Sequence, residues 1–271
     1  MEQIISQDLN LIQWLVLAFI QGITEYLPVS SSAHLILVSK VMQWPDQGLI
    51  MDIAAHGGSL LAVLWYFKEE VQKLFKGENW TLFNKLALAS IPLALAGGLL
   101  AGQIEDKLRA PNIISTVIAL SSLLFGLLLY LSDRKQKKAQ LGNKVQKNEI
   151  NLKQAITIGI AQILALIPGA SRSGVTMTAA MAMGFNREKA ARFSFLLAIP
   201  ALLMTTSYGF LKVIQQPQDY NVLGVLVVFL VSFLASLISI KLFLKLIETI
   251  PMSFYLFYRV LLAVLVIWFV A

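Results

Sequence analysis

The stretch that decides the fold is QGITEYLPVSSSAH, residues 21–34, which has a counterpart in AQILALIPGASRSGVT, residues 161–176. Both stretches interrupt apolar sequence, and when Pro28 is aligned with Pro168, Ser31 falls opposite Ser171. Hydroxyl, carboxylate, imidazole and guanidinium groups are costly at membrane depth, so a membrane chain that keeps them there needs a functional reason. We therefore expect the chemistry of the protein at these two stretches.

The composition indicates an integral membrane protein. Of the 271 residues, 57% are apolar and 14% are charged, whereas a soluble domain has about 25% charged residues. Continuous apolar runs favour spanning helices over the alternating strands of a barrel. The net charge of +7 sits in a few loops, which fits the positive-inside rule and argues against a nucleic-acid partner.

Two further features of the composition limit the alternatives. The chain has no cysteine, which excludes disulfides and thiolate metal sites. No Lys or Arg precedes Lys40, and a secretory signal has a basic leading end, so we expect the first apolar segment to stay in the mature protein.

Ten apolar segments can be counted along the chain. Six are long enough to cross a bilayer as helices, at about 18 to 24 residues each: about 51–68, 82–101, 112–131, 188–211, 221–244 and 252–271. The other four form two pairs, each broken by one of the polar stretches: 10–27 with 34–44, and 153–167 with 174–184. The return segments would rise only about 15 Å. We predict two re-entrant helix–loop–helix hairpins, at 10–44 and 153–184.

One hairpin and three spans in each half imply an inverted-topology repeat, because three crossings turn the second half upside down. We expect the two broken elements to meet near the midplane. The predicted fold is an all-α polytopic membrane protein with a first repeat at 1–131, a basic linker at 132–152 and a second repeat at 153–271. The lysines and arginines of the linker place it in the cytoplasm, with both termini outside. Its polar composition predicts a flexible connector.

The second stretch has the features of an anion site. Ser171, Arg172 and Ser173 open a helix, and free N–H groups and the dipole at a helix N-terminus attract anions. The guanidinium fork of Arg172 matches phosphate oxygens, and Ser173 and Thr176 add hydroxyl donors. We predict a phosphate group as the ligand. Arg172 could instead be a structural clamp on carbonyl groups or on Glu25.

The first stretch adds groups that catalysis needs. Gln21 and Glu25 share a helix face, and His34 follows Ser31 by three residues. A histidine can activate a serine hydroxyl, and Glu25 could hold a divalent cation or orient the histidine. Simpler roles stay open: Ser30, Ser31 and Ser32 as helix caps, His34 as a packing residue, and Gln21 as a tie between helices.

Two residues outside these stretches are also candidates. His56 either faces the cavity or packs, and Arg259 is either a partner behind the site or a residue that snorkels to the membrane surface. The chain lacks a phosphate-loop motif and a zinc-binding histidine pair. Since His34 and His56 are its only histidines, a serine nucleophile or an attacking water is favoured over phosphohistidine.

These residues resemble the BacA-type undecaprenyl-diphosphate phosphatase family of bacterial membranes. Residues 21–34 resemble its first signature and residues 168–176 its second. The resemblance implies removal of the terminal phosphate of undecaprenyl diphosphate, which recycles the lipid carrier of cell-wall synthesis and confers bacitracin resistance. It also implies dependence on Mg²⁺ or Ca²⁺, and a location in the bacterial inner membrane with the site open toward the periplasmic face.

The same resemblance suggests roles for individual residues. It implies Ser31 as nucleophile and His34 as acid or base. Arg172 would bind phosphate in a site lined by the residues Ser30, Ser171, Ser173 and Thr176. Many members have glutamate where this chain has Gln21, so Glu25 would carry more of the cation binding.

The expected partners are a prenyl diphosphate lipid and the bilayer, and the oligomeric state, a homodimer included, stays open. A lipid-carrier flippase or an anion transporter would share this architecture and is the alternative function.

Overall fold

The computed structural model describes residues 10–141, 149–215 and 220–270, which form helices joined by turns, with no strand among them. The elements are α1 (Leu11–Tyr26), α2 (Ser31–Val41), α3 (Gly48–Tyr66), α4 (Lys68–Phe75), α5 (Trp80–Leu108), α6 (Ile114–Leu141), α7 (Leu152–Gln162), the 3₁₀ turn η1 (Ile163–Leu166), α8 (Arg172–Ala182), α9 (Arg187–Gln215), α10 (Val222–Leu246) and α11 (Met252–Val270).

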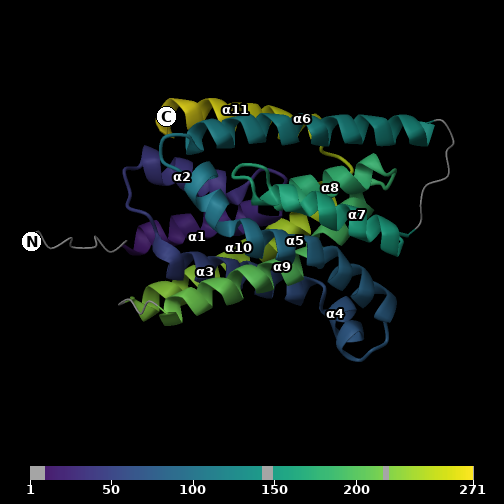
Figure 1. The fold of residues 1–271 in the computed structure, drawn as a ribbon, viewed down its shortest axis with the longest axis horizontal. Coiled ribbons are helices and arrows are strands. Elements are labelled where there is room, and N and C mark those ends of the chain that lie inside the picture. The colour runs from purple at the N-terminus through teal and green to yellow at the C-terminus, as the bar shows by residue number, and fades with distance from the viewer. Residues whose placement is uncertain (1–9, 142–148, 216–219, 271) are drawn as a thin grey trace, which may run out of the picture.

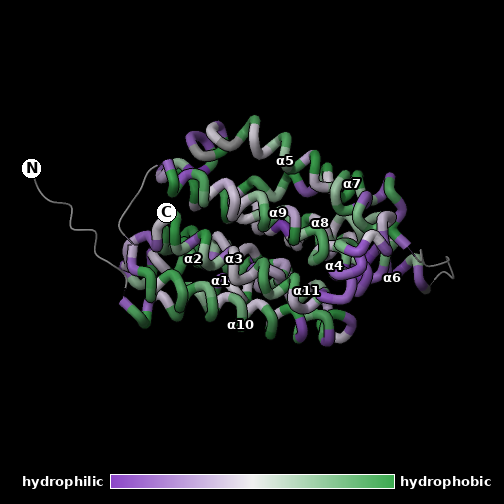
Figure 2. The backbone as a smooth tube through the Cα atoms, turned by 90° about the horizontal axis from the view of Figure 1, so that it is seen from below, coloured by the Kyte–Doolittle hydropathy of each residue, from purple (hydrophilic) through white to green (hydrophobic). Residues whose placement is uncertain are grey.

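Six of these helices are long and apolar enough to cross a membrane within the described ranges: α3, α5, α6, α9, α10 and α11. They coincide with the six predicted spans to within a few residues, except that α5 and α6 extend further at their C-terminal ends. Figure 2 shows hydrophobic residues along the helices and hydrophilic residues gathered near α4 and the end of α6. The prediction of an all-α polytopic membrane protein is confirmed.

The two short helix pairs have the same local geometry at a spacing of 141 positions. Asn10 and Asn151 each cap a helix with a capping box. Ser30 and Ser171 each precede the return helix with a positive φ, 74° and 67°. Ser30 is therefore the counterpart of Ser171. The alignment on the prolines is wrong by one residue, because the N-cap turn, and not the proline, is the fixed point of each loop.

Each hairpin packs against helices of the other half of the chain. Helix α1 lies on α10 and α7 on α5, while α2 contacts α11 and α8 contacts α6. In Figure 1, α1 starts at one end of the long axis and α7 at the opposite end. The loops 27–30 and 167–171 thus approach each other from opposite ends.

Helix α1 can approach α10 closely because the contact is made of small residues. A Cβ on Gly22 would lie 2.6 Å from the Cβ of Ala235. Ser236 and Ser239 of α10 donate hydrogen bonds to the carbonyl oxygens of Gly22 and Ile23, at 3.2 and 2.7 Å. Small residues and interhelical hydrogen bonds replace the hydrophobic effect as the source of helix association in lipid, and here they fix the helix that carries Glu25.

The basic linker differs from its prediction. Residues 132–141 continue α6 as helix, and residues 142–148 lie outside the described residues. The cause is a buried ion pair: Arg187 Nε and Nη2 donate to the two carboxylate oxygens of Asp133 at 2.5 and 2.8 Å. Arg187 also donates to the carbonyl oxygen of Ile250 at 3.1 Å. One face of this charged segment is therefore fixed to α9 and to the α10–α11 turn. Helix α4, which the sequence analysis did not anticipate, lies before α5.

Candidate active site

The two loops meet, as the sequence analysis predicted. Ser173 Oγ, at the start of α8, donates to the carbonyl oxygen of Leu27 at 2.8 Å. Arg259 of α11 donates from Nε to Pro28 O at 2.7 Å and from Nη2 to Ala170 O at 2.9 Å. A single guanidinium thus joins the backbones of both loops.

The carboxylate of Glu25 is the point where the two signature stretches connect. Its Oε2 accepts hydrogen bonds from Gln21 Nε2 and from Ser31 Oγ, each at 2.9 Å. Its Oε1 accepts from Arg172 Nη2 at 3.1 Å. The side chains of Glu25 and Arg172 are 8% and 12% exposed. The pair therefore lies in a low-dielectric region, where it interacts more strongly than it would at the protein surface.

The guanidinium of Arg172 is held in place from a second side. Its Nη1 donates to the carbonyl oxygen of Ser194 in α9 at 3.4 Å, and its Cζ lies 5.9 Å from the centre of the Tyr26 ring. Thr176 Oγ1 lies 2.6 Å from Ser194 Oγ and also bonds the Arg172 carbonyl at 2.9 Å. Arg172 and Thr176 thus share Ser194 of α9 as a neighbour.

Both return helices begin at this centre, α2 at Ser31 and α8 at Arg172. The residue before each helix has a positive φ, which is uncommon for a non-glycine residue and costs about 1–3 kcal/mol. Ser171 Oγ accepts from Gly174 N at 3.2 Å and so caps α8, whereas Ser30 makes no side-chain cap to α2. The capping role suggested for Ser30 is therefore wrong for its hydroxyl, and the side-chain cap lies at its counterpart Ser171. Both helices thus start beside Glu25, since Ser31 and Arg172 each donate to its carboxylate.

The loop before α8 needs a glycine. Gly169 has φ +87°, and a Cβ there would collide with Ser121 Oγ and the Ile118 backbone. Ser121 Oγ donates to Pro168 O at 2.5 Å. The Pro168-Gly169 turn is thereby pressed against α6, which sets the height at which α8 begins.

His34 lies in the site but does not bond to Ser31. Its Nδ1 is 2.6 Å from Ser30 O and its Nε2 is 2.5 Å from the hydroxyl of Tyr258 in α11. A carbonyl only accepts, so Nδ1 carries the proton and Nε2 of the neutral ring accepts from Tyr258. The rings of His34 and Tyr258 are stacked, with centroids 5.5 Å apart and planes at 11°. Ser31 donates to Glu25 instead.

Arg259 is fully buried at 0% exposure, so the alternative that it snorkels to the membrane surface is wrong. Besides its bonds to the two loops, it donates to Ser122 O of α6 at 3.3 Å. No acidic partner accompanies it in the described part of the chain. Glu25 and Arg172 balance each other, so Arg259 leaves the centre with a net positive charge, which favours an anionic ligand.

Tyr258, Ser194 and Ser122 belong to the site, and the sequence analysis did not single them out. A Tyr-Arg pair inside the otherwise apolar α11 was an available signal, since polar groups in a span need a reason. Ser122 and Ser194 gave none, because isolated serines are common in membrane helices. His56 bonds within its own helix: its Nδ1 lies 2.8 Å from Asp52 O of α3, and no hydrogen bond connects it to the centre within the described ranges.

The residues around Glu25 fit a divalent cation that takes most of its ligands from water and substrate rather than from the protein. No group of three or more acidic, histidine or cysteine residues occurs within the described ranges. Gln21 Oε1, however, is buried and has no hydrogen-bond partner among the described residues, while the same amide bonds Glu25. A carboxylate and an amide oxygen suit Mg²⁺ or Ca²⁺, and Mg²⁺ often completes its shell with water and substrate phosphates.

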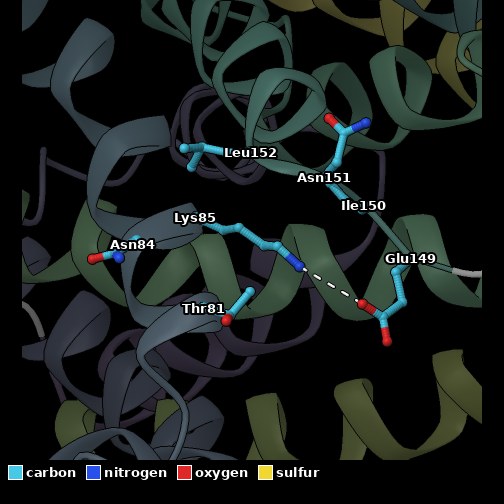
Figure 3. A pocket seen from close by; sticks show the side chains of 7 residues that line it. All are labelled: Thr81, Asn84, Lys85, Glu149, Ile150, Asn151 and Leu152. Carbon is cyan, nitrogen blue, oxygen red and sulfur yellow. Dashed lines mark ion pairs between the residues drawn. The ribbon is translucent and has the colours of Figure 1, made fainter.

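A hollow of about 340 Å³ lies away from this centre, where α5 and α7 begin. Figure 3 shows Lys85 and Glu149 reaching toward each other across it, and they lie 4.0 Å apart. None of the predicted site residues lines it.

Comparison of the sequence with known proteins identifies the family of this chain. The chain is 42% identical over 267 residues to Undecaprenyl-diphosphatase 1 of Pseudoalteromonas translucida, and the alignment covers 94% of this chain and 97% of the relative. It is 41% identical over 277 residues to Undecaprenyl-diphosphatase of Colwellia psychrerythraea, with 97% and 100% covered. It is 37% identical over 272 residues to the protein of the same name from Campylobacter curvus, with 96% and 99% covered. Residues 14–265 match the family described as Bacitracin resistance protein BacA, and the chain belongs to that family.

Proposed function

We propose that this protein is a membrane phosphatase that hydrolyses undecaprenyl diphosphate to undecaprenyl phosphate and inorganic phosphate. The observation that carries the proposal is the junction of Glu25, Ser31 and Arg172, three groups from two hairpins. A transporter needs no hydroxyl hydrogen-bonded to a carboxylate beside an anion-binding arginine. Membership of the BacA family points to the same reaction and to a role in bacitracin resistance.

In the proposed reaction Arg172 binds the terminal phosphate with its fork. The N–H groups at the starts of α2 and α8, with the Ser173 and Thr176 hydroxyls nearby, stabilise charge on the equatorial oxygens. Arg259 adds a permanent positive charge behind both loops. When phosphate takes over Arg172, Oε1 of Glu25 loses its partner, while Oε2 still accepts from Ser31.

Ser31 is the proposed nucleophile, because its hydroxyl already donates to Glu25 at 2.9 Å. Its oxygen bonds to the terminal phosphorus, its proton passes to Glu25, and the bond from phosphorus to the bridging oxygen breaks to release the prenyl monophosphate. Water then cleaves the phosphoserine to serine and inorganic phosphate. Direct attack by water, with Glu25 as base, is the alternative route to the same products.

His34 has a supporting role in this scheme. Its proton on Nδ1 holds Ser30 O, and so holds the strained turn that presents Ser31. Glu25 with the Gln21 amide oxygen would hold Mg²⁺ or Ca²⁺. The cation would supply charge neutralisation on the phosphate oxygens.

The test is phosphate release from undecaprenyl diphosphate by the purified full chain in detergent, with and without a chelator. We expect release that stops with the chelator and returns with Mg²⁺ or Ca²⁺. Ser31→Ala and His34→Ala are compared side by side. Lipid binding without any release would contradict the phosphatase and point to transport.

The proposed location is the bacterial inner membrane, with the site open toward the periplasmic face. The support is the set of basic residues near the end of α6 and the start of α9, among them Arg134, Lys137 and Arg192, which the positive-inside rule puts in the cytoplasm. Because the chain has no cysteine, single cysteines report the orientation directly. We expect Asp46→Cys to react with an impermeant thiol reagent in intact cells and Lys76→Cys to react only after lysis. The reverse pattern would overturn the orientation.

A further inference from the structure

An apolar groove of about 520 Å³ lies between α1, α2 and α11. Its lining is apolar throughout, with Ile20 and Leu37 at one end and Ile12, Met42 and Phe269 at the other. Several of these side chains are open to the surroundings, Ile12 at 67% and Met42 at 52% exposure. The groove is thus a feature of the lipid-facing surface and not an internal void.

The helical spacing shows where the groove leads. On α2, Leu37 and Val41 follow His34 by three and seven residues, so they continue the helix face that carries the imidazole. On α11, Leu265 follows Tyr258 by seven residues and lies on the same face as the phenol. Both apolar faces therefore end in the hydrogen-bonded pair of His34 and Tyr258.

The third wall gives the same result. On α1, Ile12, Val16 and Ile20 recur every four residues, and the next position on that face is Thr24. Thr24 is adjacent to Glu25 in the sequence. The inner end of the groove therefore lies within one helical turn of the residues that would bind a diphosphate.

We propose that this groove holds the first isoprenoid units of the substrate, next to its diphosphate. The inference rests on the proposed function and names where the chain of that substrate lies. The pattern of polarity carries it: a positively charged polar centre continues, through the His34–Tyr258 pair, into a channel lined only by apolar side chains. A prenyl diphosphate has the same order of a charged head and an apolar chain. Tyr258 is 37% exposed. Its ring would contact the isoprenoid chain, while its hydroxyl stays bonded to His34.

The first experiment fills the groove. Val16→Trp and Val41→Trp are made in the full chain, with Leu230→Trp as the matched control on the lipid-facing side of α10, where Leu230 is 54% exposed. With farnesyl diphosphate as substrate, we expect KM to rise about five- to tenfold in both groove variants. The tryptophan would take the place of the prenyl chain, which then loses its packing contacts with the groove. We expect kcat to stay within about twofold, because no residue of the polar centre is changed. Equal KM in groove and control variants would overturn the proposal.

The second experiment does not depend on how the variants fold. The wild-type protein is irradiated with a farnesyl diphosphate analogue that carries a photoreactive group on its chain, and the labelled peptides are identified by mass spectrometry. We expect labels on α1, α2 and α11 that undecaprenyl diphosphate suppresses and that an excess of phospholipid does not. Labels spread over α10, or suppressed equally by phospholipid, would mean a general lipid contact and would refute the groove. Failure of the phosphatase proposal is separate: it would appear as absence of phosphate release from the wild-type protein.

Discussion

Arg172 donates a hydrogen bond of 3.1 Å to Glu25 across 147 positions of sequence. Each residue comes from a different broken helix pair, and each is held by further partners from its own side. Glu25 also accepts from Gln21 and Ser31, whereas Arg172 also donates to Ser194 O. The ion pair is consistent with a structural clamp and with a phosphate-binding site before substrate binds. The two roles predict different activities for variants of Arg172.

Loss of Arg172 should abolish turnover without unfolding the protein. Removal of one charge-stabilising donor costs about 10²–10³ in kcat in comparable sites, so Arg172→Ala should fall at least that far. Arg172→Lys should recover only part of the loss, because lysine lacks the fork. Phosphate release measures the rate, and thermal unfolding in detergent measures the fold. Near-normal release by Arg172→Ala would reduce Arg172 to a clamp.

Ser31 and Ser32 provide a matched pair of hydroxyls. Ser31→Ala should lower kcat by at least about 10²-fold if the serine attacks phosphorus. Ser32 is exposed, and its hydroxyl has one side-chain hydrogen bond among the described residues, to Ser30 Oγ at 3.3 Å. Ser32→Ala should stay within about twofold of wild type. If Ser31→Ala loses little, water is the nucleophile, and Glu25→Gln should then be the more damaging change.

Tyr258 should position His34, and the effect can be seen by spectroscopy. Tyr258→Phe keeps the stacked ring and removes a hydrogen bond worth about 0.5–1.5 kcal/mol, which predicts a fall in kcat of about two- to twelvefold. The chain has two histidines, so ¹⁵N-histidine spectra of a His56→Gln background report His34 alone. We expect the wild-type ring to carry its proton on Nδ1, and Tyr258→Phe to shift the Nε2 resonance. An unchanged Nε2 signal would deny the contact.

Gln21 should set the affinity for the divalent cation. Gln21→Glu places a second carboxylate beside Glu25, and carboxylates bind Mg²⁺ and Ca²⁺ better than amides do. We expect half-maximal activation at an about tenfold lower cation concentration in Gln21→Glu, and a higher one in Gln21→Leu. Titration of chelator-treated enzyme measures both. Identical titration curves for the three proteins would exclude Gln21 as a ligand.

The Asp133–Arg187 pair should stabilise the fold without affecting the chemistry. Both side chains are nearly buried, 5% and 2% exposed, so Asp133→Leu leaves an unpaired buried charge and should cost about 3–5 kcal/mol. The double variant Asp133→Leu with Arg187→Met should recover most of that loss. Thermal melts of the four proteins form the cycle, and activity per folded molecule should not change. A double variant no more stable than Asp133→Leu would show that Arg187 acts mainly through its bonds to the α10–α11 turn.

The sequence by itself determined the fold class. The length of an apolar run decides whether a helix can cross a bilayer, and this is a local property that can be read residue by residue. The six spans and the two short pairs broken at Pro28 and Pro168 followed from it. The candidate residues were also local, because Glu25, Ser31 and Arg172 are costly wherever they stand in such a chain.

Only the tertiary structure decided which of these residues meet. The sequence suggested His34 as the partner of Ser31, yet the helix geometry turns His34 toward Tyr258 and turns Ser31 toward Glu25. The sequence also left two roles open for Arg259. It predicted a flexible connector where α6 in fact continues, because Arg187, the partner that buries Asp133, lies 54 positions away in the sequence. Hydropathy reports the cost of putting each side chain into the membrane. The partner that stabilises a polar side chain there depends on packing between helices distant in the sequence, which no local pattern records.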